Sequence, residues 1–341
     1  MIECNQNPPL FHDYTKLLSQ SRDQIDVKRL MNHEPGLEEC ELPLVDLCGL
    51  WSENEEERAS CASEICKASS EWGFFQIVNH GISLELLWKM RKEQVKLFKA
   101  PFERKTASGL LDNSYRWGNQ TATCPKQLSW CEAFHVPLSK ISDDTCYGEF
   151  NSLRKVMQEY ASAMQELAKS IARVLVANMG AQRGVWEDRC NASTCFMRLN
   201  RYPPCPVSPE LFGLVPHTDS DFLTILHQDE HVGGLQLMKD SKWVAVKPNP
   251  DALVVNIGDL FQAWSNDVYK SVEHKVMVNQ EVERHSIAYF LCPSYESFIG
   301  CYDEENSIYR RFTFGEYRSQ IQQDVKAFGH KVGLPRFLVS T

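Results

Sequence analysis

The sequence lacks the features that mark several large classes of protein. No stretch approaches the roughly 18 consecutive apolar residues of a transmembrane helix. Residues 1–5 have neither the basic start nor the apolar core of a signal peptide. Lysine and arginine number 36 against 45 aspartates and glutamates. This acidic balance argues against nucleic acid or an anionic membrane as a partner, because both attract basic surfaces.

The cysteines show no pairing pattern. The chain has 13 of them among 341 residues, and no Cys-x-x-Cys motif occurs. Zinc ribbons depend on such motifs, and disulfide scaffolds are typical of short secreted chains. An odd, scattered set in a long chain therefore indicates reduced thiols. It predicts a cytoplasmic protein, with the nucleus as the alternative.

The sequence does contain enough apolar residues, 43% of the chain, to bury a large core. Residues 1–40 are polar and irregular, with a short helix expected around 14–18. Apolar periodicity then predicts strands over 41–47 and 72–78, and helices over 53–70, 84–99, 153–179 and 313–328.

The pattern changes between residues 194 and 292, where short apolar runs alternate with Gly, Pro, Asn and Asp. These runs predict eight strands, at 195–202, 214–217, 223–228, 235–238, 243–247, 252–257, 271–278 and 284–291. Such close spacing favours a sandwich, barrel or jelly roll over alternating βαβ units.

We therefore predict one compact, mainly β protein with packed helices, of the α+β class. An N-terminal extension (1–40) precedes a region of helices and strands (41–190), which wraps on a jelly-roll core (191–300). A helical segment (301–341) ends the chain. The sequence leaves the oligomeric state open.

Residues 217–219, His-Thr-Asp, place two potential metal ligands one residue apart. On a strand, residues i and i+2 point to the same face, so His217 and Asp219 could reach one cation. His274 is the candidate for a third ligand. Two imidazoles and one carboxylate on one side of a metal suit Fe(II) with open coordination positions. Alone, a His-x-Asp pair is more often found on the protein surface.

Two further pairs share a strand face, Asn200 with Tyr202 and Arg284 with Ser286. A buried arginine in the apolar strand 284–291 is costly unless an anion pairs with it. The guanidinium fork suits a carboxylate, and we expect a small carboxylate ligand to supply the charge. Ser286 and Tyr202 could donate hydroxyl hydrogen bonds to the same anion. The alternative is an internal salt bridge.

Over residues 40–300 the chain resembles the plant 2-oxoglutarate-dependent Fe(II) dioxygenases. The resemblance rests on Glu-Trp-Gly-Phe-Phe-Gln-Ile-Val-Asn-His-Gly-Ile (71–82), Asn-Arg-Tyr-Pro-Pro-Cys-Pro (200–206), His-Thr-Asp (217–219), Val-Glu-His (272–274) and Arg-His-Ser (284–286). It implies a double-stranded β-helix. It also implies catalytic iron held by His217, Asp219 and His274, and 2-oxoglutarate bound by Arg284, Ser286, Tyr202 and Asn200.

Within that family, residues 114–118, 128–137 and 264–274 resemble the gibberellin 2-oxidases that act on C20 gibberellins. Cys131 stands where serine is expected, a small departure. The resemblance implies inactivation of C20 gibberellins by 2β-hydroxylation, with O2 as co-substrate and ascorbate as reductant. Two alternatives stay open. One is the same chemistry on C19 gibberellins or another small metabolite such as a flavonoid, and the other is a hormone-binding protein without turnover.

A gibberellin is a rigid apolar skeleton that carries carboxylates, so its pocket should be mostly apolar with a few placed polar groups. Arg116 is the leading candidate for a substrate carboxylate, because it lies among aromatic residues in a stretch without a regular secondary-structure pattern. Tyr115, Trp117 and His135 are expected to line the same pocket.

Overall fold

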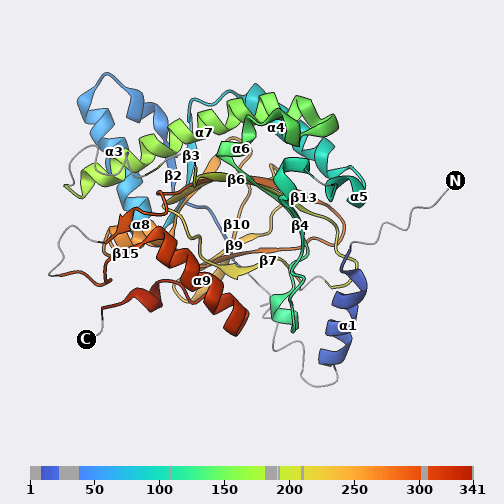
Figure 1. Cartoon of the computed structure of the whole chain (residues 1–341). Coiled ribbons are helices and arrows are strands. Elements are labelled where there is room, and N and C mark those ends of the chain that lie inside the picture. The colour runs from blue at the N-terminus through green and yellow to red at the C-terminus, as the bar shows by residue number, and fades with distance from the viewer. Residues whose placement is uncertain are drawn as a thin grey trace.

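The computed structural model describes residues 9–22, 38–107, 109–180, 190, 193–208, 211–300 and 306–339. It contains an eight-stranded and a five-stranded sheet, with helices packed around them (Figure 1). The larger sheet has the order β2-β3-β11-β8-β13-β6-β5-β4, and the smaller one the order β1-β10-β9-β12-β7. The predicted α+β class is confirmed.

All eight strands predicted between residues 194 and 292 are present. They are β6 (Phe196–Tyr202), β7 (Phe212–His217), β8 (Leu223–His227), β9 (Leu235–Lys239), β10 (Lys242–Val246), β11 (Leu253–Ile257), β12 (His274–Met277) and β13 (Arg284–Leu291). Strands β6, β8, β11 and β13 form the centre of the larger sheet, and β7, β9, β10 and β12 make up most of the smaller one. The chain thus passes repeatedly between two sheets, as the predicted double-stranded β-helix requires.

The N-terminal region extends the larger sheet at both edges. Strands β2 (Leu44–Asp46) and β3 (Phe74–Val78) continue it beyond β11, and β5 (Glu132–Pro137) and β4 (Tyr115–Trp117) continue it beyond β6. The expectation that the stretch around Arg116 has no regular structure was wrong. Strand β4 is too short to show a period in the sequence, and it forms by pairing with β5.

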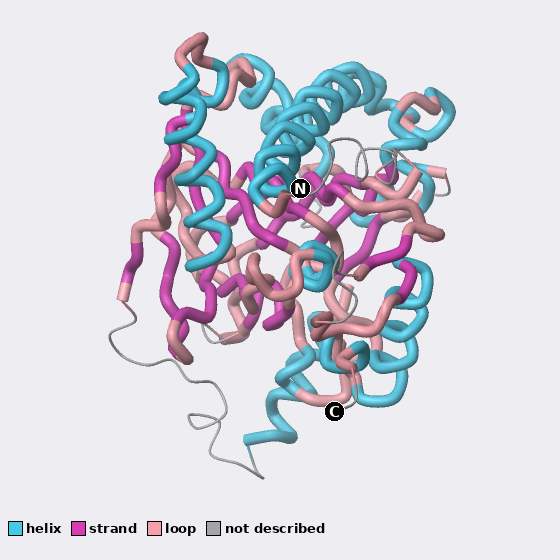
Figure 2. The backbone as a smooth tube through the Cα atoms, turned by 90° about the vertical axis from the view of Figure 1, so that its left-hand side faces the viewer, coloured by secondary structure: helices cyan, strands magenta, loops and turns pink. Residues whose placement is uncertain are grey.

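The longest helices cover the outer face of the larger sheet. Helices α4 (Leu84–Phe98) and α7 (Asn151–Asn178) pack on each other, α7 rests on β8 and β13, and α3 (Glu55–Glu71) packs on α7 (Figures 1 and 2). The buried side of α7 follows a helical period, with Leu153, Met157, Tyr160, Met164, Leu167, Ile171 and Leu175. None of the described helices is long and apolar enough to cross a membrane.

The remaining elements are shorter or lie towards the ends of the chain. They are α1 (Phe11–Arg22), β1 (Glu39–Cys40), α5 (Phe102–Lys105), α6 (Leu138–Ile141), α8 (Asp259–Trp264), β14 (Phe298–Ile299), β15 (Phe312–Thr313) and α9 (Phe314–Phe328). The expected helix at 14–18 is part of the longer α1. A capping box between Thr313 and Glu316 starts α9, and Gly329, with φ 77°, ends it.

Candidate metal centre and active-site cavity

Two facing strands bring the three predicted metal ligands together. His217 ends β7 and His274 begins β12, and these two residues are direct partners across the two strands. Their ring centroids are 4.3 Å apart. Asp219 lies beyond the end of β7, so the expectation that a shared strand face aligns it with His217 was wrong. The segment after β7, which has no regular secondary structure, carries its carboxylate to the imidazoles instead, and one atom from each residue lies within 4.8 Å of the others.

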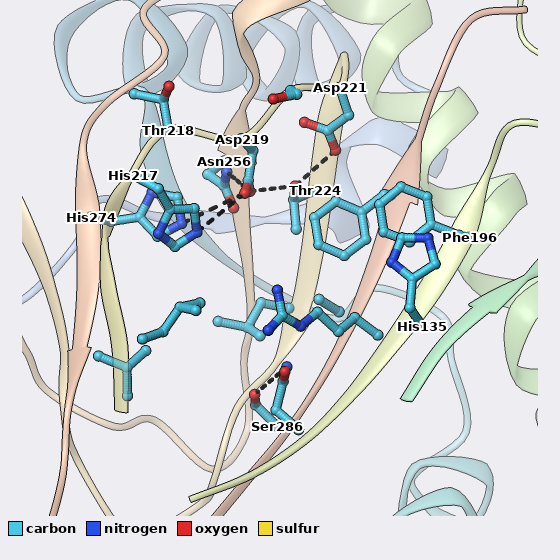
Figure 3. Close-up of a pocket in the computed structure, with 18 of the residues that line it drawn as sticks. His135, Phe196, His217, Thr218, Asp219, Asp221, Thr224, Asn256, His274 and Ser286 are labelled. Carbon is cyan, nitrogen blue, oxygen red and sulfur yellow. Dashed lines mark hydrogen bonds and ion pairs between the residues drawn. The ribbon is translucent and has the colours of Figure 1, made fainter. Parts of the chain in front are cut away.

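Each of the three side chains has one atom held by the protein and one atom left for a metal. His217 Nδ1 lies 2.8 Å from the carbonyl oxygen of Val215, and His274 Nδ1 lies 3.1 Å from that of Val272. An imidazole that donates from Nδ1 has its Nε2 lone pair free to bind a metal. The two Nε2 atoms lie 3.6 and 3.8 Å from Oδ1 of Asp219 (Figure 3).

The carboxylate of Asp219 is oriented in the same way. Its Oδ2 accepts hydrogen bonds from Thr224 Oγ1 at 2.7 Å and from Asn256 Nδ2 at 2.8 Å, which leaves Oδ1 for the metal. Burial raises the pKa of Asp219, but the two imidazoles and these two hydrogen bonds outweigh it and lower the pKa to about 2. An ionised carboxylate between two imidazole nitrogens fits the donor set of Fe(II).

A cavity of about 320 Å³ opens beside these ligands, within the jelly roll. Phe74, Leu235 and Val276 form part of its apolar wall and belong to a buried cluster between the two sheets. The predicted co-substrate residues also line it. On β13 and β6, Arg284 is paired with Tyr202 and Ser286 with Asn200, so these four residues occupy alternate, cavity-facing positions of two neighbouring strands.

Arg284 is buried, and no described residue supplies a counter-ion for it. It is 2% exposed, and none of its three guanidinium nitrogens has a hydrogen-bond partner in the described structure. Burial lowers the pKa of Arg284, while Tyr202 and Asp229 raise it. The guanidinium lies 5.3 Å from the centre of the Tyr202 ring. The Asp229 carboxylate accepts backbone N–H groups of residues 231, 232 and 285 and forms no ion pair with Arg284.

Nearby polar groups are also incompletely satisfied. Asn200 Nδ2 donates to Ser286 Oγ at 3.2 Å, but Asn200 Oδ1 has no hydrogen-bond partner among the described residues. Unpaired buried polar atoms are costly, and a cluster of them around a buried cation indicates a place that a ligand completes.

The four predicted substrate residues do not gather. Only His135 lines the cavity. Arg116 is exposed, and its Nη1 donates to the backbone oxygens of Asn113 and Tyr115. Tyr115 and Trp117, which flank it on β4, are buried in the main core. Because side chains alternate along a strand, burying these two aromatic rings turns Arg116 outwards.

Comparisons with known proteins agree with this geometry. Residues 193–293 match the family model described as the 2OG-Fe(II) oxygenase superfamily, and residues 42–188 match the model described as non-haem dioxygenase in morphine synthesis N-terminal. Gibberellin 2-beta-dioxygenase 8 of Arabidopsis thaliana is 52% identical over 95% of both chains. The chain belongs to the 2OG-Fe(II) oxygenase superfamily.

Other members of the superfamily give the same result. Gibberellin 2-beta-dioxygenase 6 of Oryza sativa subsp. japonica is 53% identical over 97% of this chain and 96% of its own. The protein in the crystal structure of JOX2 in complex with 2OG, Fe and JA has 31% sequence identity to this chain. The two structures superpose with a TM-score of 0.72 over 94% of this chain and 97% of that one. The predicted enzyme class, dioxygenase, and the predicted use of iron and 2-oxoglutarate are therefore confirmed.

Sequence reasoning missed the residue that braces the iron site of this dioxygenase. Asp259, 3% exposed, binds Thr218 Oγ1 at 3.1 Å, Ser271 Oγ at 2.6 Å, the Tyr317 hydroxyl and Lys331 Nζ at 2.6 Å. It thereby ties the segment that carries Asp219 to the approach to His274 and to the C-terminal segment. Its partners lie far apart in the sequence, so no local pattern could have revealed it.

Sequence reasoning also missed Arg198 and Arg318, which line the cavity. Arg198 could have been found, because it continues the alternation that starts with Tyr202 and Asn200 on β6. Arg318 lies on α9, and only the fold brings it to the cavity.

Proposed function

We propose that this dioxygenase inactivates gibberellins by 2β-hydroxylation, with C20 gibberellins as preferred substrates. The observation that carries the proposal is the ligand set His217, Asp219 and His274, whose free atoms converge beside a cavity with apolar and cationic parts. Identities of 52% and 53% to gibberellin 2-beta-dioxygenases over nearly the whole chain support the choice of substrate.

Each group of residues has a separate task. His217, Asp219 and His274 would hold Fe(II), which, when bound, supplies the oxidation of a substrate C–H bond with O2 and 2-oxoglutarate. Arg284 would bind the far carboxylate of 2-oxoglutarate through its guanidinium fork. Ser286, Tyr202 and Asn200 would hydrogen-bond to the co-substrate from the same two strands.

The cavity wall would position the substrate carbon. Apolar side chains such as Phe74, Leu235 and Val276 form part of this wall beside the metal ligands, and apolar surroundings limit the access of water to a reactive centre. The position of the substrate decides which carbon is hydroxylated, because the carbon nearest the metal reacts. The chain need not supply a general acid or base to break the C–H bond.

The test is a product assay with purified protein, Fe(II), 2-oxoglutarate, ascorbate and O2. We expect succinate release to depend on added gibberellin, and the product to be 2β-hydroxylated, with a higher kcat/KM for a C20 than for a C19 gibberellin. Asp219→Ala should abolish both succinate and product, because it removes the one carboxylate ligand. Gibberellin binding without succinate release by the wild type would favour a hormone-binding protein. Release with a flavonoid alone would redirect the substrate.

A further inference from the structure

The cavity has a second cationic region, distinct from Arg284. Strands β5, β6 and β13 run side by side, with Arg198 between His135 on one neighbour and Ala288 on the other. Arg198 is four residues from Tyr202, about 13 Å along the strand. A five-carbon diacid that spans from the metal to Arg284 therefore leaves Arg198 free for another ligand.

Helix α9 supplies a second guanidinium to the same end of the cavity. Arg318 lines the cavity together with Phe314, Ile321 and Gln322, which share one side of this helix. Its Nη1 lies 3.0 Å from the Tyr295 hydroxyl, and its guanidinium lies 5.9 Å from the centre of the Phe314 ring. Tyr295 and Phe314 thus fix the direction of the Arg318 side chain.

Neither Arg198 nor Arg318 forms an ion pair with any carboxylate in the described parts of the chain. His135 lies within the field of both. Burial, and then the positive charges of Arg198, Arg318 and Arg116, lower the pKa of His135 to about 4. This end of the cavity therefore carries two permanent positive charges beside a neutral imidazole at pH 7.

A flat aromatic wall lies next to these charges. The His135 and Phe196 rings are stacked with centroids 4.0 Å apart, and Phe196 and Phe290 are stacked at 4.3 Å (Figure 3). Figure 3 places His135 and Phe196 across the cavity from His217 and His274. An apolar skeleton can lie against such a wall while a carboxylate extends to a guanidinium.

We propose that Arg198 and Arg318 bind a carboxylate of the substrate and thereby set which carbon faces the metal. This inference rests on the proposed function, which identifies the substrate as a gibberellin. The two arginines themselves require only that the substrate is a rigid apolar molecule with a carboxylate. Both arginines are specificity residues in this role, and Arg284 is reserved for 2-oxoglutarate.

The experiment compares Arg198→Met, Arg318→Met and the double variant with Arg116→Met as the matched control. Arg116 is on β4, which β5 separates from β6, and its side chain lies outside the cavity. Binding of a C20 gibberellin and of its methyl ester is measured by calorimetry under nitrogen, with Fe(II) and 2-oxoglutarate present. The wild type should bind the acid at least about 10-fold more tightly than the ester, as expected for charge-assisted hydrogen bonds.

Each single cavity variant should lose about 10-fold in affinity for the acid and little for the ester, while Arg116→Met matches the wild type. An unchanged Kd for 2-oxoglutarate shows that a variant is folded. Equal affinity for acid and ester in the wild type, or unchanged acid binding in the double variant, would overturn the proposal.

The outcomes separate the two proposals. If the wild type forms 2β-hydroxylated product but the double variant binds the acid normally, the arginine proposal alone fails. If the arginines govern acid binding but no 2β-hydroxylated product forms, the proposed function alone fails. If the wild type binds neither acid nor ester, both fail.

Discussion

Lys105 and Arg284 are buried to the same extent, each 2% exposed, but the protein treats their charges differently. Lys105 Nζ lies 2.5 Å from Glu132, whose other oxygen binds Arg201 at 2.8 Å. Arg284 has no such partner among the residues that the structure describes. The chain thus neutralises the cation that serves its structure, and leaves unpaired the cation that faces the cavity. A buried charge without a counter-ion therefore indicates a site where a ligand of opposite charge binds.

The strongest test of this contrast removes the internal counter-ion. Glu132→Gln leaves Lys105 buried without a carboxylate partner, and breaking a buried pair in this way costs about 3–5 kcal/mol. We expect that loss in the free energy of unfolding, measured with urea. Glu283→Gln is the matched control, because Glu283 also binds Arg201 but is part-exposed, and its loss should stay below about 1 kcal/mol. Equal losses in the two variants would contradict the contrast.

Removing the unpaired cation should have the opposite pattern. We expect Arg284→Met to weaken 2-oxoglutarate binding by at least about 100-fold, since a buried carboxylate of the ligand loses its partner. The free energy of unfolding of the ligand-free protein should stay equal or rise, because an uncompensated buried charge has gone. Calorimetry and urea unfolding measure the two effects. The control variant Lys105→Met should lower the free energy of unfolding and leave 2-oxoglutarate binding unchanged. A lower free energy of unfolding for Arg284→Met would contradict the contrast, because it would mean that Arg284 has an internal partner.

A third buried basic group, His227, needs no counter-ion because its imidazole stays neutral. It is 6% exposed, and burial, followed by the charges of Arg91 and His80, lowers the pKa of His227 to about 3. Because the unfolded chain takes up this proton below pH 6.5, its contribution to stability is complete above that pH and is lost as the pH falls towards 3.

Between pH 7 and 5 the wild type should therefore lose about 2 kcal/mol more than His227→Gln in the free energy of unfolding. Urea unfolding at a series of pH values measures this difference. The exposed residue His231 supplies the control, and His231→Gln should follow the wild type. Parallel pH profiles for wild type and His227→Gln would show that His227 is protonated in the folded state.

The smallest expected effect concerns a paired cation that acts on the metal site. Lys331 Nζ binds Asp259 at 2.6 Å and the carbonyl oxygen of Thr218 at 2.8 Å, next to the ligand Asp219. Lys331→Met should weaken metal binding about 10-fold, the lower end for residues that orient ligands. Titration with Co(II), followed by its absorption, gives the affinity. The exposed Lys326→Met should bind Co(II) as the wild type does, and an unchanged Lys331→Met would remove Lys331 from the metal site.

The sequence predicted the fold and the metal ligands well because both depend on short-range patterns. The eight core strands are short apolar runs with clear ends, and His217, Asp219 and His274 lie in conspicuous motifs. The prediction that Arg116 lines the substrate pocket failed, because an arginine among aromatic residues gives the same sequence pattern whether its side chain points into a cavity or away from it. Pairing of β4 with β5 decides the direction, and that pairing depends on residues far away in the chain.

Helix α9 lies outside the jelly roll, yet Phe314, Arg318, Ile321 and Gln322 form one wall of the cavity. In the proposed arrangement, α9 supplies Arg318 to the surface that selects the substrate, whereas Arg198 and the metal ligands come from the jelly roll. Mutations that accumulate along one side of this helix can change which hormone or metabolite is accepted without disturbing the iron.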